Sequence, residues 1–176
     1  MTIQPTPTRM FDLKPLSKDA VPAALARAER YRLLNEPGEA ESICLDVLRV
    51  EPANQEARVM LLLALTDQFL QDSSSRAMAR AGDLAADLAD EYERAYYAGI
   101  IRERLAKAIL QRDRYGAVAA AADWLRDAMA LYERAEAHRP AHNDESLLRW
   151  NACARLLMQL PEPAPDLDQP EPLQLE

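Results

Sequence analysis

Apolar positions recur with the helical period along most of the chain. Between residues 39 and 50 they fall at i, i+3, i+4, i+7 and i+8, occupied by Ala40, Ile43, Cys44, Val47 and Leu48. This spacing is typical of an amphipathic helix that buries one face. Residues 59–65 are apolar on nearly all sides, which is typical of a helix packed between neighbours. The pattern therefore predicts a chain built mainly from packed α-helices.

Start and stop signals divide the centre of the chain into about seven helices. Asn54 is expected to cap the third helix, and Asn143 or Asp144 the seventh, because short polar side chains accept hydrogen bonds from the first turn. Pro52 and Pro140 end the second and sixth helices. The expected ranges are 20–34, 39–50, 55–70, 76–89, 92–112, 115–138 and 144–160.

The boundary between the fourth and fifth helices is open to two interpretations. No strong helix breaker lies between Leu88 and Tyr92, so one continuous rod is an alternative. We expect a break near Asp90, because the stacking of helical hairpins requires one there.

The two ends of the chain lack a sustained period. Residues 1–19 contain Pro5, Pro7 and Pro15, and we expect a flexible N-terminal arm. Residues 161–176 are rich in proline and acid, with too few apolar positions to fold, and we expect a disordered acidic tail. One helical domain is expected between them, over residues 20–160.

One spacing of residues occurs twice in this domain. In each copy a small residue is followed by a bulkier one, a compact apolar one and a proline, at identical offsets. The copies are Ala40, Cys44, Val47 and Pro52, and Ala128, Tyr132, Ala135 and Pro140. Each copy lies on a stretch with helical period, so the spacing predicts stacked helical hairpins.

Residues 21–54 resemble a tetratricopeptide repeat, which is a helix–turn–helix of about 34 residues with a signature of small and aromatic positions and a closing proline. Ala28 occupies the small position of the first helix and Tyr31 the aromatic one. Ala40 falls where the two helices cross. Cys44 replaces the usual aromatic residue of the second helix, and Val47 replaces the usual alanine.

The rest of the domain resembles the family less closely. Residues 128–140 match the second helix of a repeat, but residues 111–124 look inserted before it. Residues 55–89 form a degenerate pair, and the helix after Asp144 would cover the apolar edge of the stack. The resemblance implies an all-α superhelix of stacked antiparallel hairpins, with a concave groove lined by the first helix of each repeat.

The resemblance also implies which side chains face that groove. The candidates are Leu25, Glu29, Arg32, Arg58 and Leu62. Glu29 stands where the carboxylate-clamp members of the family have an asparagine, so we do not expect binding of a chaperone tail. An apolar groove with Arg32 and Arg58 at its rim is expected instead.

Charge and hydropathy restrict the partners. The net charge of −8 disfavours nonspecific binding of nucleic acid, where lysine and arginine must neutralise phosphates. The longest apolar run, residues 59–65, is far shorter than the ~20 residues of a membrane span, and the N-terminus has no apolar signal region. A cytoplasmic protein without nucleic-acid or membrane partners is expected.

The fifth helix carries a local excess of basic residues. Arg104, Lys107 and Arg114 share roughly one face and form a candidate basic strip for an acidic peptide. The alternative is pairing with the acid-rich fourth helix or plain solvation.

No pattern of residues indicates catalysis. His138 and His142 flank Pro140 and are therefore expected on a turn, not on one metal-binding face. Cys44 and Cys153 are expected as buried reduced thiols. Phosphate-binding and zinc-protease motifs are missing from the sequence. No catalytic residue, metal or cofactor is expected.

The sequence thus predicts a non-catalytic adaptor of tetratricopeptide type, which holds a peptide or helix of a partner protein in a groove. A self-associating structural module and an accessory subunit of an enzyme complex are the alternatives.

Overall fold

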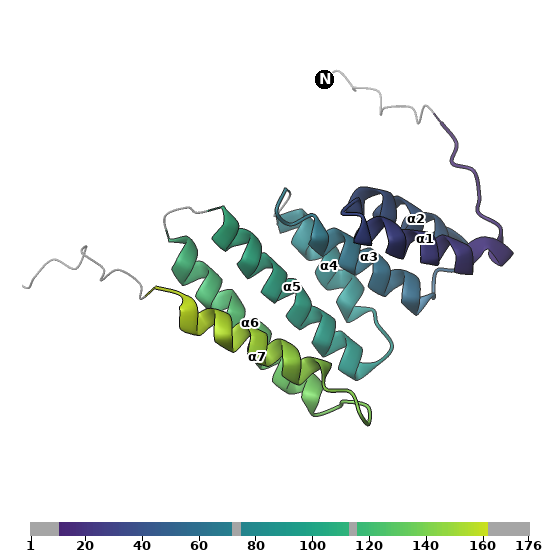
Figure 1. The fold of residues 1–176 in the computed structure, drawn as a ribbon. Helices are drawn as coiled ribbons and strands as arrows, with labels where there is room; N and C mark the ends of the chain where they lie inside the picture. Colours follow the sequence, from purple (N-terminus) through teal and green to yellow (C-terminus); the bar gives the residue numbers. More distant parts are fainter. Residues whose placement is uncertain (1–10, 72–74, 113–115, 162–176) are drawn as a thin grey trace, which may run out of the picture. The chain divides into compact units, whose positions relative to one another are not determined.

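The structure, a computed structural model, describes residues 11–71, 75–112 and 116–161. Within these ranges the regular secondary structure is entirely helical, which confirms the predicted all-α fold (Figure 1). A short 3₁₀ helix, η1 (Lys18–Ala20), precedes seven α-helices. They are α1 (Val21–Leu33), α2 (Pro37–Val50), α3 (Gln55–Asp67), α4 (Ser75–Ala86), α5 (Glu91–Gln111), α6 (Ala117–Glu136) and α7 (Glu145–Gln159).

The helix termini follow from local chemistry. The Asn54 side chain accepts a 2.9 Å hydrogen bond from the backbone N–H of Ala57, as predicted for a cap. The break near Asp90 is also confirmed: α4 ends at Ala86, α5 begins at Glu91, and Asp90 accepts a 2.9 Å bond from the backbone N–H of Glu93. The third helix ends at Asp67 instead of residue 70.

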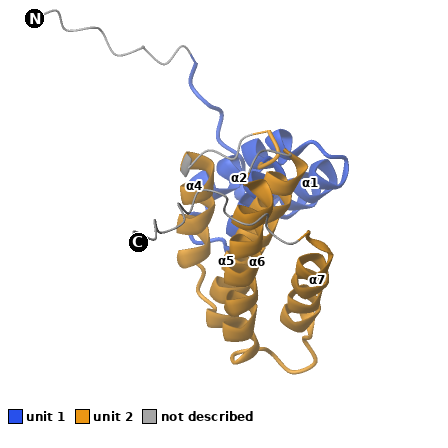
Figure 2. Ribbon diagram, turned by 90° about the vertical axis from the view of Figure 1, so that its left-hand side faces the viewer, with its two compact units in different colours: residues 1–68 blue, residues 69–176 orange. Residues whose placement is uncertain are grey.

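The chain divides into two compact units, residues 1–68 and 69–176 (Figure 2). Residues 20–160, which the sequence predicts as one helical domain, span both units. The predicted hairpin over residues 55–89 is divided between the units, with α3 in unit 1 and α4 in unit 2.

Unit 1 is a bundle of α1, α2 and α3, which pack on one another. Its core contains Val21, Leu25, Val47 and Ala57, with Leu16 packed against it from the segment before α1. The first copy of the repeated spacing lies in this interior, because Ala40, Cys44 and Val47 are fully buried.

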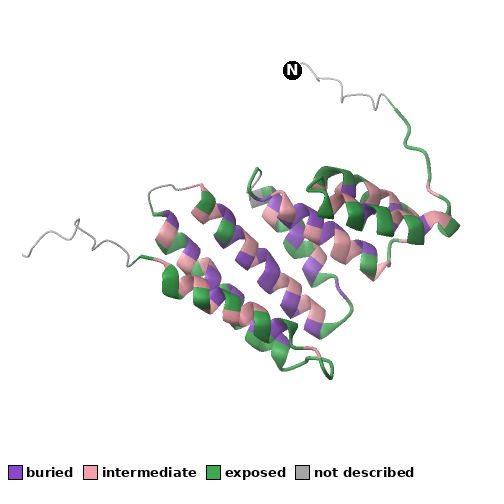
Figure 3. Ribbon diagram, in the orientation of Figure 1, coloured by how far each residue is buried: buried purple, intermediate pink, exposed green. Residues whose placement is uncertain are grey.

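Unit 2 contains α4 to α7. Helix α5 packs against α4 and α6, and α6 packs against α7. The second copy of the spacing is buried as well: Ala128, Tyr132 and Ala135 have at most 1% of their surface exposed. Figure 3 shows that buried residues also recur along α5, against which α6 packs. Both copies therefore mark helix-packing positions, as their sequence indicates.

The arm before α1 is only partly within the described residues. Phe11 and Leu13 are exposed, whereas Leu16 is half-buried. Residues 1–10 of the predicted arm, and the predicted tail from residue 162 on, lie outside the described residues.

Candidate functional site

The predicted groove set does not lie together on an open surface. Leu25 and Leu62 are 3% and 0% exposed and belong to the interior. Their apolar side chains fill space between helices, so they offer no contact to a partner, contrary to expectation. Arg32 donates a 2.7 Å ion-paired bond to Asp67, and Arg58 donates to the Pro52 carbonyl at 2.9 Å. Glu29 is exposed on α1.

The predicted basic strip is largely engaged within the protein. Lys107 is 2.5 Å from the carboxylate of Glu103, one turn earlier on α5. Arg104 is half-buried and also has an interaction partner. Arg114 lies outside the described residues. Binding of an acidic peptide at this strip therefore stays a prediction, and at Lys107 the peptide would compete with Glu103.

Glu103, which no sequence pattern singled out as a site residue, joins three helices through its carboxylate. Its side chain is 1% exposed. One carboxylate oxygen, Oε2, accepts a 2.6 Å hydrogen bond from the hydroxyl of Tyr132 on α6. The other oxygen, Oε1, accepts from Lys107 and, at 3.3 Å, from Arg149 on α7. The buried charge is therefore compensated by donors from α5, α6 and α7.

The electrostatics of this cluster favour an ionised carboxylate. Burial alone would raise the pKa of Glu103, but the hydrogen bonds from Lys107 and Tyr132 and the charges of Lys107 and Arg149 outweigh it and lower the pKa below its usual value. Burial and the Glu103 charge raise the pKa of Tyr132, so its phenol keeps its proton. Both carboxylate oxygens accept hydrogen bonds from within the protein. Because the donors come from α5, α6 and α7, the cluster links these three helices.

Beside this cluster, α5 and α6 approach closely at Gly99. A Cβ atom at this position would lie 2.6 Å from the ring of Tyr132. Tyr96 also contacts this ring, with centroids 5.9 Å apart, and stacks on Tyr92 at 5.5 Å. The three tyrosines therefore pack in the interior of unit 2.

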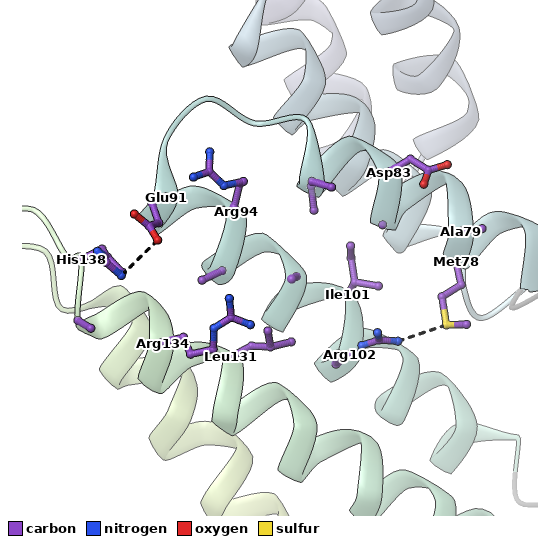
Figure 4. A pocket seen from close by; sticks show the side chains of 16 residues that line it. Met78, Ala79, Asp83, Glu91, Arg94, Ile101, Arg102, Leu131, Arg134 and His138 are labelled. Carbon is purple, nitrogen blue, oxygen red and sulfur yellow. Dashed lines mark hydrogen bonds and ion pairs between the residues drawn. The ribbon is translucent and has the colours of Figure 1, made fainter.

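An open cleft of about 630 Å³ lies between α4, α5 and α6 within unit 2 (Figure 4). One face of α5 forms its floor, and α4 and α6 form its walls. Small apolar side chains dominate the surface, and charged side chains surround it. The lining residues are Met78, Ala79, Gly82, Asp83, Ala85, Ala86, Glu91, Arg94, Ala95, Ala98, Ile101, Arg102, Leu131, Arg134, Ala137 and His138. We call this feature the α4–α5–α6 cleft.

The α5 arginines of the cleft are positioned by neutral partners. Arg94 donates to the backbone carbonyls of Leu88 and Ala89 at 2.8 and 2.9 Å. The guanidinium of Arg102 lies 4.7 Å from the ring centroid of Trp124 and 3.8 Å from the Met78 sulfur. Within the described parts of the chain neither arginine contacts an acid, so both bring an unpaired positive charge to the cleft.

Two further charged side chains stand on opposite walls of the cleft. Arg134 belongs to α6 and Asp83 to α4 (Figure 4). Both are exposed, and neither forms an ion pair with the residues that the structure describes. At the end of the cleft, His138 Nε2 lies 3.5 Å from the Glu91 carboxylate. Asp83 and Arg134 thus lie on opposite walls, and between them the α5 floor combines small apolar side chains with Arg94 and Arg102.

Periodicity on α5 is the one sequence signal that could have found this cleft. Ala95, Ala98 and Arg102 recur at helical spacing on the face that forms its floor. Small residues on the α4 wall, among them Ala79, Gly82 and Ala86, leave this space open. The groove residues predicted from the sequence lie on α1 and α3, and the predicted strip of Arg104, Lys107 and Arg114 does not include the cleft arginines Arg94 and Arg102.

The other reactive side chains are dispersed. His138 lies at the cleft, whereas His142 lies on the following turn with a positive φ of 64°. Cys44 and Cys153 are buried and unpaired by disulfides, and burial raises the pKa of each thiol to about 12. Among residues 11–71, 75–112 and 116–161, no group of three His, Cys, Asp or Glu side chains is placed to hold a metal ion.

No protein-family model matches the chain, and a comparison with curated proteins gives no match. None of the helices described is both long and apolar enough to cross a membrane.

Proposed function

We propose that the protein is a non-catalytic interaction module of tetratricopeptide type, which holds a segment of a partner protein in the α4–α5–α6 cleft. The observation that carries this proposal is the cleft itself: about 630 Å³ of open space, an apolar floor and a charged rim. Sites that bind other molecules combine such an apolar surface with a few polar groups that fix orientation.

The tetratricopeptide assignment is supported by packing. Both copies of the repeated spacing are buried, and the close approach of Tyr132 to Gly99 pairs an aromatic with a small residue between consecutive helices. Successive helices pack in chain order within each unit. These features are what a stack of helical hairpins requires.

The non-catalytic part of the proposal is supported by the state of the reactive groups. The thiols of Cys44 and Cys153 stay protonated at neutral pH, so they are poor nucleophiles. The Glu103 carboxylate is enclosed by its own donors. Around the cleft, Asp83 and Arg134 lie on separate walls, and His138 and Glu91 form an exposed pair at one end. Acid–base chemistry requires groups that converge on one reacting atom. A cytoplasmic location is part of the same proposal.

The experiment places a photo-crosslinking amino acid at position 98 in the full chain, within cells of the source organism. Ala98 is on the cleft floor. The matched control carries the same amino acid at Ala120, an exposed alanine of α6 outside the cleft. We expect position 98 to capture a specific protein that position 120 does not capture. Identical capture at both positions, or no capture at position 98, would contradict the proposal.

The second candidate function is self-association through α7. Leu148 and Met158 on this helix are 62% and 84% exposed, which favours a further packing partner. Sedimentation of the wild-type chain and of the Leu148→Lys variant at several concentrations tests it. A monomer at every concentration excludes this candidate. Should the captured partner be an enzyme subunit, the adaptor would be an accessory subunit.

A further inference from the structure

We propose that the segment held in the α4–α5–α6 cleft is an amphipathic α-helix with acidic side chains on the flank that faces α6 and basic side chains on the flank that faces α4. This inference rests on the proposed function, because it names the chemistry of the partner at the same site.

The backbone of the cleft favours a helical partner over an extended one. Its floor and walls come from α4, α5 and α6, whose interior N–H and C=O groups are already bonded within each helix. An extended peptide would bury its own backbone groups against them without partners, which costs free energy. A helix enters with its backbone groups bonded internally.

The dimensions of the cleft also suit a short helix. Its floor on α5 runs from Glu91 to Arg102. At 1.5 Å per residue this length is about 16 Å, or three turns of a facing helix. Ala79 and Gly82 on one wall and Ala98 on the floor carry small side chains or none. Small residues at a helix–helix contact permit close approach of the two backbones.

The distribution of charge sets the polarity of the partner. On the α6 wall, Arg134 is exposed and has no acidic partner among the described residues. Arg94 and Arg102 on the floor have neutral partners only. The α4 wall presents the Asp83 carboxylate. A helix with Asp or Glu beside Arg134 and with Lys or Arg beside Asp83 meets both walls with opposite charge, and this complementarity governs specificity and association rate.

The test uses a displayed library of 14-residue helical peptides with random residues on both flanks. The peptides are selected on the full-length chain, and binders are kept only when the Ala98→Trp variant, which fills the floor, does not bind them. Ala79→Trp fills the cleft from the α4 wall, and it replaces Ala98→Trp in this comparison if that variant does not fold. Circular dichroism and thermal unfolding check each variant.

We expect the selected peptides to be helical and to carry acids on one flank and bases on the other. Arg134→Glu should weaken their binding about tenfold or more, because like charges replace a complementary pair. Exchange of the peptide acids for lysine should restore it. Asp83→Lys should also weaken binding, and exchange of the basic residues of the peptide for glutamate should restore it. Arg155→Glu reverses an exposed arginine of α7 outside the cleft and should leave binding unchanged.

Three outcomes separate this inference from the proposed function. Cleft-dependent peptides without the two-sided charge pattern, or cleft-dependent peptides that bind in an extended form, overturn the inference and leave the function standing. Absence of any cleft-dependent binder overturns both. Self-association of the wild type that Ala98→Trp abolishes would show a second copy in the cleft, and it would also overturn the inference.

Discussion

The ring of Tyr132 on α6 lies so close to Gly99 on α5 that a Cβ atom at position 99 would be 2.6 Å from it. Tyr132 has 1% of its surface exposed, and its hydroxyl is bonded to Glu103 at 2.6 Å. The ring is thus held by packing against Gly99 and by the hydrogen bond of its hydroxyl. We expect these contacts to contribute to the stability of unit 2.

Replacement of Gly99 by alanine should lower the free energy of unfolding by about 1–2 kcal/mol. Overpacking costs about 1–3 kcal/mol, and the better helix propensity of alanine returns up to about 1 kcal/mol. Urea titration followed by tryptophan fluorescence measures the change, because Trp124 and Trp150, the two tryptophans of the chain, lie in unit 2. Gly82→Ala is the control, since a Cβ there meets no atom within 4 Å. Equal effects of the two substitutions would contradict the close contact.

Removal of the Tyr132 hydroxyl in Tyr132→Phe should cost about 1–3 kcal/mol of unfolding free energy. The Glu103 carboxylate then stays buried with one donor missing, and an unsatisfied buried charge is penalised. The same urea titration measures it. Tyr97→Phe is the matched control, because Tyr97 is half-buried and forms no side-chain hydrogen bond within the described residues. Its change should stay within about 0.5 kcal/mol. A Tyr132→Phe change as small as that of the control would show that the hydrogen bond contributes little.

The Glu103 cluster predicts a loss of stability in acid. The folded pKa of Glu103 is below its unfolded value, so at acidic pH the unfolded chain binds this proton first and stability falls as pH falls. The contribution is complete above about pH 4.5 and declines toward lower pH. The difference in unfolding free energy between wild type and Glu103→Gln separates the contribution of Glu103 from that of the other carboxyl groups. We expect this difference to be largest at pH 7 and to shrink toward pH 3; a constant difference would refute the cluster's role.

The two thiols should be unreactive in the folded protein. Burial raises the pKa of Cys44 and of Cys153 to about 12, so the thiolate fraction at pH 8 is orders of magnitude below that of a free cysteine. A disulfide reagent added at pH 8 should label neither thiol in buffer and both in strong denaturant. Labelling of either thiol in buffer at the rate of free cysteine would place it at the surface.

Helix positions could be predicted from the sequence because they depend on local chemistry. Asn54 and Asp90 cap helices through bonds to residues three positions away, and such contacts are visible in a single stretch of chain. The buried ladder that includes Tyr132 was predictable for the same reason, since small and apolar residues at fixed offsets define one face of a helix.

The Glu103 cluster was not predictable in this way. Glu103 follows Arg102 and precedes Arg104, so its sequence context suggests a solvated acid. Its partners Tyr132 and Arg149 lie on two later helices, and only the fold brings them together. Long-range contacts of this kind leave no periodic signal.

The burial of Leu25 and Leu62, two of the predicted groove residues, was not predictable for a related reason. Periodicity identifies the apolar face of a helix but not the element that covers it. Leu25 and Leu62 lie on such faces and are covered, whereas Ala98 lies on a face that is left open. An open face lined by alanine looks in sequence like an ordinary packing face, so the cleft emerged only from the structure.

One face of helix α5 packs against α6 and contacts α7, and another face lines the cleft. This separation affects which substitutions the protein can accept during evolution. Gly99 and Glu103 hold α6 and α7, so substitution at either position risks the fold. Ala98 lines the cleft, where a new side chain meets open space. Under the proposed function, a residue such as Ala98 can therefore change without disturbing the contacts of α5 with α6 and α7, and a change of partner needs no compensating gain in stability.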